Sequence, residues 1–593
     1  MSGGFFQSEG KINVAQSDIR ISAENGLDFQ QDQVVGIYIP PSVKYFSGKD
    51  TFLQFDALIT GDSSDASIYP TRLTLDGEIG ANSLFSQMRV YAGNRETLLE
   101  ENTEYASYVS VKYNFDKDDV EQKKRAMTEG CGSWVPNTRG TEGTTRSVCN
   151  DYVYSPFIEG VNEGLDKDPE GLVDSVPPYQ SAKITLPLHS GIFAENSKVF
   201  PNLLTNGIYI ELVMAGNRNL FRQYDGCIRD RRRDLLPMFY GVDKDGLAWK
   251  DGDPATAIFV GYENNQKIPS NCPFVVGEKI SFTKVDGTDV TLTDAANSVI
   301  TGIQTVDKYL KLSLSGTGPV NNNGADITDG NYFLYSSSLK EATSTSVFNP
   351  TCKISNVELI VHQIQMSPEY EKGMLSKVRE NGGVVKFDFP SVGVQRYSTL
   401  KSEVQASIPI HLDYARARGI LCMPTDAKLY PCHHQTSAEG TYMITKDKDK
   451  FQEDWELRSN RTGLEGCSNG LSEYSFFLNG KMVPSRPINT RKTTNKAGGI
   501  DANYIVELEK SLVSFGIDVK SFEYYNRNFL VGRMLAIGNN AVFDGRGRTA
   551  RLDLKYDGTE AGYNEPSVNL LWKVFVSHIR TLVIKANDIQ VEM

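Results

Sequence analysis

The sequence contains few of the residues that carry metal or nucleophile chemistry. Its 593 residues include only eight Cys, six His and four Trp. The cysteines show no compact spacing, which argues against a disulfide framework and favours free thiols in a reducing compartment. No apolar run approaches the roughly 18 residues of a membrane span, and the opening MSGGFFQSEGKINV lacks the basic start and apolar run of a signal peptide. We expect no transmembrane segment and a protein made inside the cell.

An excess of basic charge is also absent. Lys and Arg number 62 against 74 Asp and Glu, which gives a formal charge of −12. Proteins that coat nucleic acid draw their affinity from clustered Lys and Arg, so we expect no sequence-specific nucleic-acid partner. Apolar residues at 39% and charged residues at 23% exclude a disordered chain.

The residues that are abundant favour β-structure. The chain contains 28 Tyr, 28 Phe and 51 Gly, and short segments such as IYIELVM (208–214) and ASIPIHL (406–412) alternate apolar and other side chains. Alternation with a period of two places every second side chain on one face of a strand. Gly, Asn and Asp punctuate these segments, and Asn479-Gly480 between FFL and KMV is a type I′ hairpin signal. The predicted fold class is all-β, built from sandwiches.

Helices are predicted at few places. Ser367 can cap a helix, Pro368 suits its first turn, and Gly382-Gly383 can end it. A second helical stretch is predicted between residues 97 and 127. The segment from about 241 to 346 combines short strands with polar tracts, which predicts a small β insertion in a long loop.

Two segments resemble chemical motifs only weakly. Cys432-His433-His434, with Cys422 upstream, is the best metal candidate, but neighbouring residues on a strand point to opposite faces, so a loop of unliganded residues is favoured. Gly466–Gly470 matches the GxSxG string of a nucleophile elbow. A polar segment precedes it and a strand-like segment follows it, whereas an elbow needs a strand before and a helix after. A surface turn is therefore favoured.

The basic and glycosylation signals are equally weak. The run 229–233 (RDRRR) is interleaved with Asp, which favours a solvated loop or an ion-pair surface between subunits over a phosphate site. Residues 545–548 (GRGR) lack the strand and helix of a phosphate loop, and the sequon at Asn460 is attributed to chance. We assign no catalytic, cofactor-binding or metal-binding residue, expect no cofactor, and predict that the protein is not an enzyme.

The order of segments resembles a known family. A long β domain ends in KISNVELIVHQIQ, the helix SPEYEKGMLSKVREN follows, and a second β domain opens near LKSEVQASIPIHLDYARARGILCMPTD. YSFFLNGKMVPSRPI and VNLLWKVFVSHIRTLVIKANDIQVEM are similar to a middle hairpin and to closing strands of that family. The chain resembles the double jelly-roll major capsid proteins of eukaryotic double-stranded DNA viruses, with the virophage and polinton-like virus group most similar.

The resemblance implies a domain organisation and a set of partners. It implies two consecutive eight-stranded jelly rolls: an N-terminal arm at 1–26, a first jelly roll at 27–366 with the insertion at about 241–346, a connector helix at 367–383, and a second jelly roll at 384–593. It also implies a homotrimer that forms a pseudo-hexameric capsomer in an icosahedral virion shell around double-stranded DNA. Neighbouring capsomers, a single jelly-roll penton protein and minor or cement proteins are the implied partners.

Two other functions fit an acidic, turn-rich β protein. A β-sandwich adhesin or fibre protein would bind carbohydrate on exposed aromatic side chains, although only four Trp are available. A β-sandwich glycoside hydrolase would need two carboxylates at a defined separation in a cleft. No spacing in the sequence selects such a pair.

Overall fold

The structure, a computed structural model, contains mostly strands with a few short helices. It describes residues 15–62, 73–75, 79–116, 118–131, 138–139, 146–147, 182–216, 221–223, 237–241, 256–262, 280–284, 299–306, 309–315, 332–336, 349–380, 382–426, 464, 466, 470–490, 501–520, 528–536, 542–556, 569–585 and 588–592.

Eight strands in the N-terminal half form two facing antiparallel sheets. One sheet has the order β1 (Ala15–Ser22), β20 (Asn349–Gln365), β4 (Phe46–Asp62) and β10 (Ala182–Pro187). The other has the order β3 (Val34–Ile39), β12 (Ile208–Met214), β6 (Phe85–Ala92) and β7 (Thr97–Asn102). Counted in chain order, the two sheets read 1-8-3-6 and 2-7-4-5. This is the strand order of a jelly roll, in which the first strand lies beside the last.

The C-terminal half repeats this order strand for strand. Its sheets are β21 (Val385–Thr399), β28 (Leu570–Lys585), β23 (Ala417–Asp426) and β26 (Val531–Met534), and β22 (Gln405–His411), β27 (Thr549–Tyr556), β24 (Leu471–Leu478) and β25 (Lys481–Asn489). These again read 1-8-3-6 and 2-7-4-5. Short strands extend the sheets in both halves: β2 (Asp28–Phe29), β11 (Val199–Phe200) and β29 (Asp588–Glu592). The protein is a double jelly roll, as predicted.

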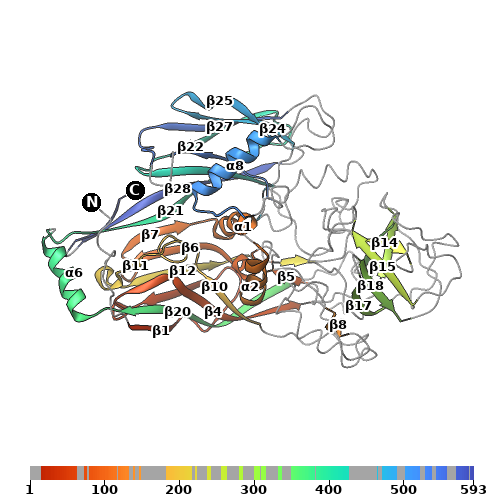
Figure 1. Ribbon diagram of the computed structural model, residues 1–593, viewed down its shortest axis with the longest axis horizontal. Coiled ribbons are helices and arrows are strands. Elements are labelled where there is room, and N and C mark those ends of the chain that lie inside the picture. The colour runs from red at the N-terminus through yellow and green to blue at the C-terminus, as the bar shows by residue number, and fades with distance from the viewer. Residues whose placement is uncertain are drawn as a thin grey trace.

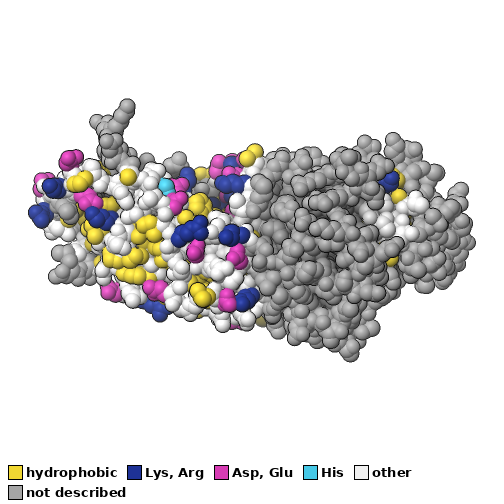
Figure 2. Space-filling model, turned by 90° about the horizontal axis from the view of Figure 1, so that it is seen from below, with side chains coloured by type: hydrophobic (Ala, Val, Ile, Leu, Met, Phe, Trp, Pro, Cys, Tyr) yellow, Lys and Arg dark blue, Asp and Glu magenta, His cyan; other side chains and the backbone are white. Residues whose placement is uncertain are grey.

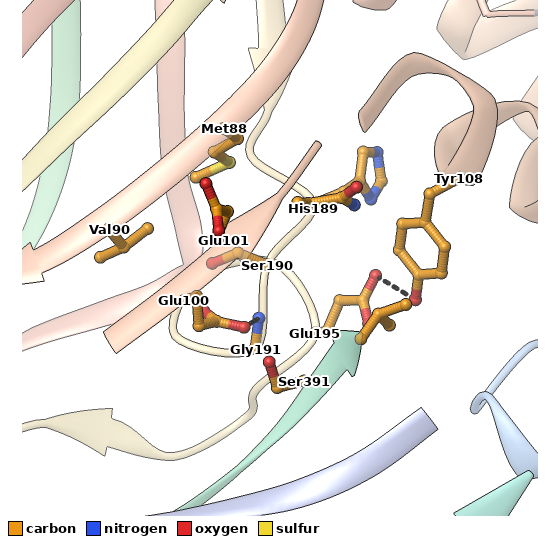
Figure 3. Close-up of a pocket in the computed structure, with 12 residues that line it drawn as sticks. Met88, Val90, Glu100, Glu101, Tyr108, His189, Ser190, Gly191, Glu195 and Ser391 are labelled. Atoms are coloured by element: carbon orange, nitrogen blue, oxygen red, sulfur yellow. Dashed lines mark hydrogen bonds between the residues drawn. The ribbon is translucent and has the colours of Figure 1, made fainter. Parts of the chain in front are cut away.

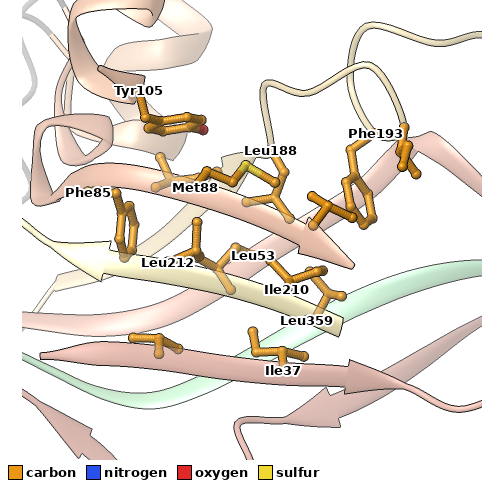
Figure 4. Close-up of a cluster of buried hydrophobic side chains, with 14 of the residues drawn as sticks. Ile37, Leu53, Phe85, Met88, Tyr105, Leu188, Phe193, Ile210, Leu212 and Leu359 are labelled. Atoms are coloured by element: carbon orange, nitrogen blue, oxygen red, sulfur yellow. The ribbon is translucent and has the colours of Figure 1, made fainter. Parts of the chain in front are cut away.

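Apolar side chains from the two sheets of each jelly roll meet in its core. Leu53 and Leu359 from one sheet face Ile37 and Ile210 from the other in the first core (Figure 4). Leu53 is paired with Leu359 in the ladder, so the alternation of the two strands directs both side chains inward. The long ladder β4–β20 fixes the strand register within the first jelly roll, and the ladder β21–β28 fixes it within the second.

A separate sheet lies between the seventh and eighth strands of the first jelly roll. Its order is β16 (Ile280–Lys284), β19 (Tyr332–Ser336), β14 (Pro237–Gly241), β15 (Ala257–Tyr262), β18 (Tyr309–Leu314) and β17 (Ile300–Val306). The first and last strands of this insertion pair at Met238 and Phe333, so it leaves and rejoins the jelly roll through neighbouring strands. Two small pairs complete the strands: β5 (Leu73–Leu75) with β13 (Phe221–Gln223), and β8 (Thr138–Arg139) with β9 (Arg146–Ser147). Figure 1 shows the inserted sheet beyond one end of the sandwiches, with both chain termini and α6 at the other end.

The helices follow the sequence signals in part. Helix α6 (Pro368–Glu380) joins the two jelly rolls, with Ser367 Oγ accepting the Tyr370 amide at its start. Helices α1 (Tyr105–Phe115), α2 (Asp119–Glu129) and α8 (Ala502–Ser514) each lie between the fifth and sixth strands of a jelly roll. The helical stretch predicted over 97–127 is wrong at its start, because residues 97–102 form β7 in the ladder with β6.

The local turn and boundary predictions have different outcomes. Asn479 and Gly480 have φ angles of 50° and 75° between the paired Leu478 and Lys481, which confirms the type I′ hairpin. The arm expected over residues 1–26 includes β1, which pairs with β20 along its whole length. The sheet of the first jelly roll therefore includes Ala15–Ser22, which lie before the expected start at residue 27. The inserted sheet runs from Pro237 to Ser336, against an expected 241–346.

Candidate functional site

The contact between the two jelly rolls combines buried ion pairs with apolar packing. Strand β7, the fifth strand of the first jelly roll, lies against β21, the first strand of the second, and Figure 1 shows the two side by side. No ladder hydrogen bonds join them. Side chains and loops therefore hold the two halves together.

Helix α1 extends the core of the second jelly roll into the first. Every residue of α1 except Lys112 is buried, and Tyr108, Val111 and Phe115 belong to the second hydrophobic core. The Tyr108 ring lies 6.0 Å from the Phe575 ring of β28. Because α1 is buried on both sides, its sequence has no single amphipathic stripe. Its buried polar residues are hydrogen-bonded instead, and Asn114 Nδ2 donates to the Ser110 carbonyl at 2.9 Å.

An ion-pair network lies at the start of α1. Glu104 contacts Lys573 of β28 at 3.0 Å and Arg396 of β21 at 2.6 Å. Lys573 Nζ also donates to Ser107 Oγ at 2.6 Å, and its side chain is only 8% exposed. Removing one partner of a buried pair leaves an uncompensated charge, so this network fixes the relative position of the halves more than it adds net stability.

The loop before β11 packs against β21. Glu100 of β7 accepts the backbone amides of Gly191 at 3.0 Å and Ile192 at 3.1 Å, which holds the loop in place. A Cβ at Gly191 would overlap the carbonyl oxygen of Pro390, so only glycine permits this approach. Burial raises the pKa of Glu100 to about 7, against the lowering effect of the amides and of Arg580.

A small cavity lies within this contact. Figure 3 shows Glu100, Glu101, His189, Glu195 and Tyr108 around it, with the Tyr108 hydroxyl bonded to Glu195. Its volume is about 20 Å³, enough for about one water molecule and far too small for a sugar ring. The acidic groups of this cavity are therefore structural acceptors in a domain contact, and they do not form a glycosidase cleft.

Of the metal-site candidates in the sequence, only Cys422 lies within the described residues. Cys422 is buried in β23, and burial raises the pKa of its thiol above the usual range, while Cys432, His433 and His434 lie outside the described residues. Within the described residues no group of three His, Cys, Asp or Glu could hold a metal ion. Gly470 is followed directly by strand β24, whereas a nucleophile elbow needs a helix there, and residues 467–469 lie outside the described residues.

The remaining candidates are the two basic segments and the glycosylation sequon. The basic run 229–233 and Asn460 lie outside the described residues. Residues 545–548 form a turn before β27 in which Arg546 pairs with Asp544 at 2.9 Å and Arg548 lies over the Phe543 ring. That turn has no phosphate-loop geometry. Over the part of the chain that is described, no helix is long and apolar enough to span a membrane.

The residues of the contact between the jelly rolls are not predicted from the sequence. One signal was present: Lys573 is the single charge in the apolar run LLWKVFVSHI, and a lone charge in a buried strand needs a partner. Its partner Glu104 lies 469 positions away, so no local pattern could pair the two. Gly191 and Glu100 carry no pattern that sets them apart from other Gly and Glu residues.

Comparisons with known proteins give structural likenesses only. No family model and no curated protein matches the chain. The structure is similar to that of PBCV-1 Vp54 fitted into a reconstruction of the virophage Sputnik, with 9% identity, 99% of each chain covered and a TM-score of 0.46. It is also similar to the Faustovirus major capsid protein, with 9% identity, 98% of this chain and 92% of that chain covered and a TM-score of 0.44. The STIV major capsid protein matches with 8% identity, coverage of 95% and 96%, and a TM-score of 0.34.

Proposed function

We propose that the protein is a viral major capsid protein whose trimers tile an icosahedral shell around a double-stranded DNA genome. The observation that carries this proposal is the complete jelly-roll strand order in both halves of one chain. Jelly rolls are a common architecture of capsid subunits, and the order of segments in the sequence resembles double jelly-roll capsid proteins.

Two similar lobes in one chain suit a shell subunit. The ion pairs of Glu104 and the apolar contacts of α1 hold the lobes at a fixed relative position. Three such chains around a threefold axis would present six lobes, which gives a capsomer of nearly hexagonal outline. Six-sided units pack without gaps, as a shell requires.

The two ends of the lobes differ in a way that suits an inside and an outside. The connections that follow the odd-numbered strands emerge at one end, and in the first jelly roll they include the inserted sheet. Helix α6 lies at the other end (Figure 1). We assign the end with the insertion to the outer surface of the shell and the end with α6 to the inner surface.

The charge of −12 accords with a container that encloses DNA without neutralising it. Penton and cement proteins would be separate polypeptides that contact the trimers.

The alternative functions have less support. A carbohydrate-binding adhesin would use exposed tryptophan. Among the described residues the one Trp is Trp572, which is fully buried and donates its indole N–H to Thr399. A glycosidase would need a groove, and the acid-lined cavity between the lobes holds about one water molecule.

The mass of the purified protein in solution tests the proposal. Light scattering coupled to size-exclusion chromatography should give three times the chain mass of 65.8 kDa, or larger assemblies. A stable monomer at high concentration would overturn the proposed function.

A further inference from the structure

Glu100 places a buried carboxyl group at the contact between the two jelly rolls. It lies on β7, and only 7% of the residue is exposed. Its oxygens accept the backbone amides of Gly191 and Ile192 in the loop 188–198 (Figure 3). The same loop approaches β21 at the Pro390 carbonyl, where it leaves no room for a Cβ on Gly191. Glu100 therefore supports the part of the first jelly roll that touches β21.

Glu100 differs from the other carboxylates of this contact because it has no paired cation. Among the residues that the structure describes, no ion pair joins it to a Lys, Arg or His. Arg580 of β28 acts on it through its charge, but the Nη1 of Arg580 donates to the Leu99 carbonyl. The neighbouring carboxylates each have a basic partner: Glu101 with Arg89, Glu195 with Lys112, Glu104 with Lys573, and Asp388 with Arg416.

A buried carboxylate without a paired cation is costly, so Glu100 is the acid of this contact that takes up a proton. Burial raises its pKa from 4.5 to about 7, against the lowering effect of the loop amides and of Arg580. The hydroxyl of a protonated carboxyl has to donate a hydrogen bond. The adjoining cavity has a volume of about 20 Å³, so about one water molecule can accept that bond.

We propose that Glu100 is a proton-operated latch: its neutral form holds the loop 188–198 against β21, and its ionisation loosens this contact between the jelly rolls. When the contact opens, water hydrates the carboxylate and its pKa returns towards 4.5. Because the pKa is higher in the closed contact, closing is most favoured below pH 4.5, and this preference declines as the pH rises to about 7. The latch lies within one chain, so it goes beyond the proposed function and does not depend on it.

The other titratable groups beside the loop do not produce this pH dependence. Burial raises the pKa of Tyr108 on α1 and lowers the pKa of His189 in the loop, so both stay neutral. His578 of β28, which accepts from Arg580, has its pKa lowered by burial to about 3. Its protonation destabilises the folded chain in acid, which is the opposite sense to the effect of Glu100.

Glu129 of α2 is the one described group near the loop that titrates in the same sense. It accepts the Tyr113 hydroxyl at 2.7 Å, and that hydroxyl also contacts His189. Burial raises the pKa of Glu129 to about 7. Variants must therefore separate Glu100 from Glu129.

Hydrogen exchange of the loop 188–198, followed by mass spectrometry, tests the latch. After correction for the intrinsic exchange rate, the opening constant of the wild-type loop should rise at least about ten-fold between about pH 5 and about pH 7. Between about pH 7 and about pH 8 it should rise by about two-fold or less, because the buried carboxyl is then largely ionised. Glu100→Gln cannot ionise, so its opening constant should not change over this range.

Two further variants serve as controls. Glu101→Gln changes the next residue of β7, which lines the same cavity but pairs with Arg89, and it should keep the wild-type rise. Glu129→Gln removes the other buried carboxyl and should also keep the rise. The comparison of wild type with E129Q does not require that E100Q folds.

The outcomes separate this inference from the proposed function. An opening constant that stays level with pH in the wild type, a rise that persists in E100Q, or a rise that disappears in E129Q would overturn the latch. Each of these results leaves the capsid proposal intact, since that proposal depends on the mass of the assembly. A stable monomer that shows the expected exchange would overturn the capsid proposal alone.

Discussion

At the scale of single residues, the contact between the jelly rolls depends on a few positions whose neighbours are distant in sequence. Gly191 touches the Pro390 carbonyl, and Lys573 is held by Glu104 and Ser107. The glycine at 191 and the lysine at 573 are each required by a residue that belongs to the other jelly roll. These residues determine how the halves are oriented.

Replacing Gly191 with alanine should destabilise the protein. The new Cβ overlaps backbone that has to shift, which costs about 1–3 kcal/mol. The matched control is Gly373→Ala in the exposed face of α6, where a Cβ meets nothing within 4 Å. There alanine should stabilise by about 0.5–1 kcal/mol because it favours the helix. Urea unfolding midpoints measure both, and equal midpoints for the two variants would contradict the close approach at Gly191.

His578 should make the protein sensitive to mild acid. It is fully buried, stacks on Tyr414 at 3.9 Å, and accepts from Arg580 through Nε2 while Nδ1 donates to Val576. Burial, helped by the Arg580 charge, lowers its pKa from 6.5 to about 3. Below pH 6.5 the His578 imidazole binds a proton in the unfolded chain, whereas in the folded chain it stays neutral until the pH approaches 3. Stability therefore falls as the pH drops from 6.5 towards 3, by up to about 1.4 kcal/mol per pH unit.

A His578→Gln variant isolates this contribution. It should be less stable than the wild type near neutral pH, because it loses the stacked ring. The deficit should shrink by about 2 kcal/mol between about pH 7.5 and pH 5, since glutamine does not titrate. Denaturant unfolding at several pH values measures the difference. Parallel stability curves for the two proteins would show that His578 is not held neutral.

At the scale of elements, β1 decides where the first jelly roll begins. Its eight residues pair with β20 in full register, and Ile19 and Ile21 pack against the first core. The sequence segment AQSDIRIS is largely polar, so its alternation is short, and the resemblance alone placed it in an arm. Only the ladder with a strand more than 300 residues away shows that it belongs to the sheet.

Truncation separates the arm from the strand. Removing residues 1–14 leaves β1 and its ladder intact, so the unfolding midpoint should stay close to that of the full chain. Removing residues 1–26 deletes β1, exposes the edge of β20, and should destabilise the first jelly roll by several kcal/mol or prevent soluble expression. Thermal unfolding of the two proteins compares them. Equal stability of both truncations would show that β1 is dispensable.

The sequence predicted elements best where the determinants were local. The Asn479-Gly480 hairpin and the capped helix α6 each depend on a few adjacent residues, and both are present. Residues 97–102 read as helical because TLLEEN has good helix formers, yet pairing with β6 makes them a strand. The buried helix α1 lacks the amphipathic period that identifies a surface helix, so its role between the lobes was not predictable.

At the scale of the whole molecule, the alternating segments predict sandwiches, but they do not predict which strands pair with each other. Nothing local brings β1 beside β20 or β21 beside β28, because those ladders join chain ends of each half. The resemblance supplied the two jelly rolls, and the order 1-8-3-6 and 2-7-4-5 in both halves confirms them. The contact between the lobes was not predicted, because its ion pairs and its glycine approach exist only after both halves are folded.

We propose that three copies of this chain form a six-lobed capsomer. Electron microscopy of the purified protein, with averaging of single particles in face view, distinguishes this assembly from smaller ones. We expect a threefold-symmetric particle of nearly hexagonal outline, with six lobes around its centre. Particles of one chain with two lobes, or dimers with twofold symmetry, would contradict it.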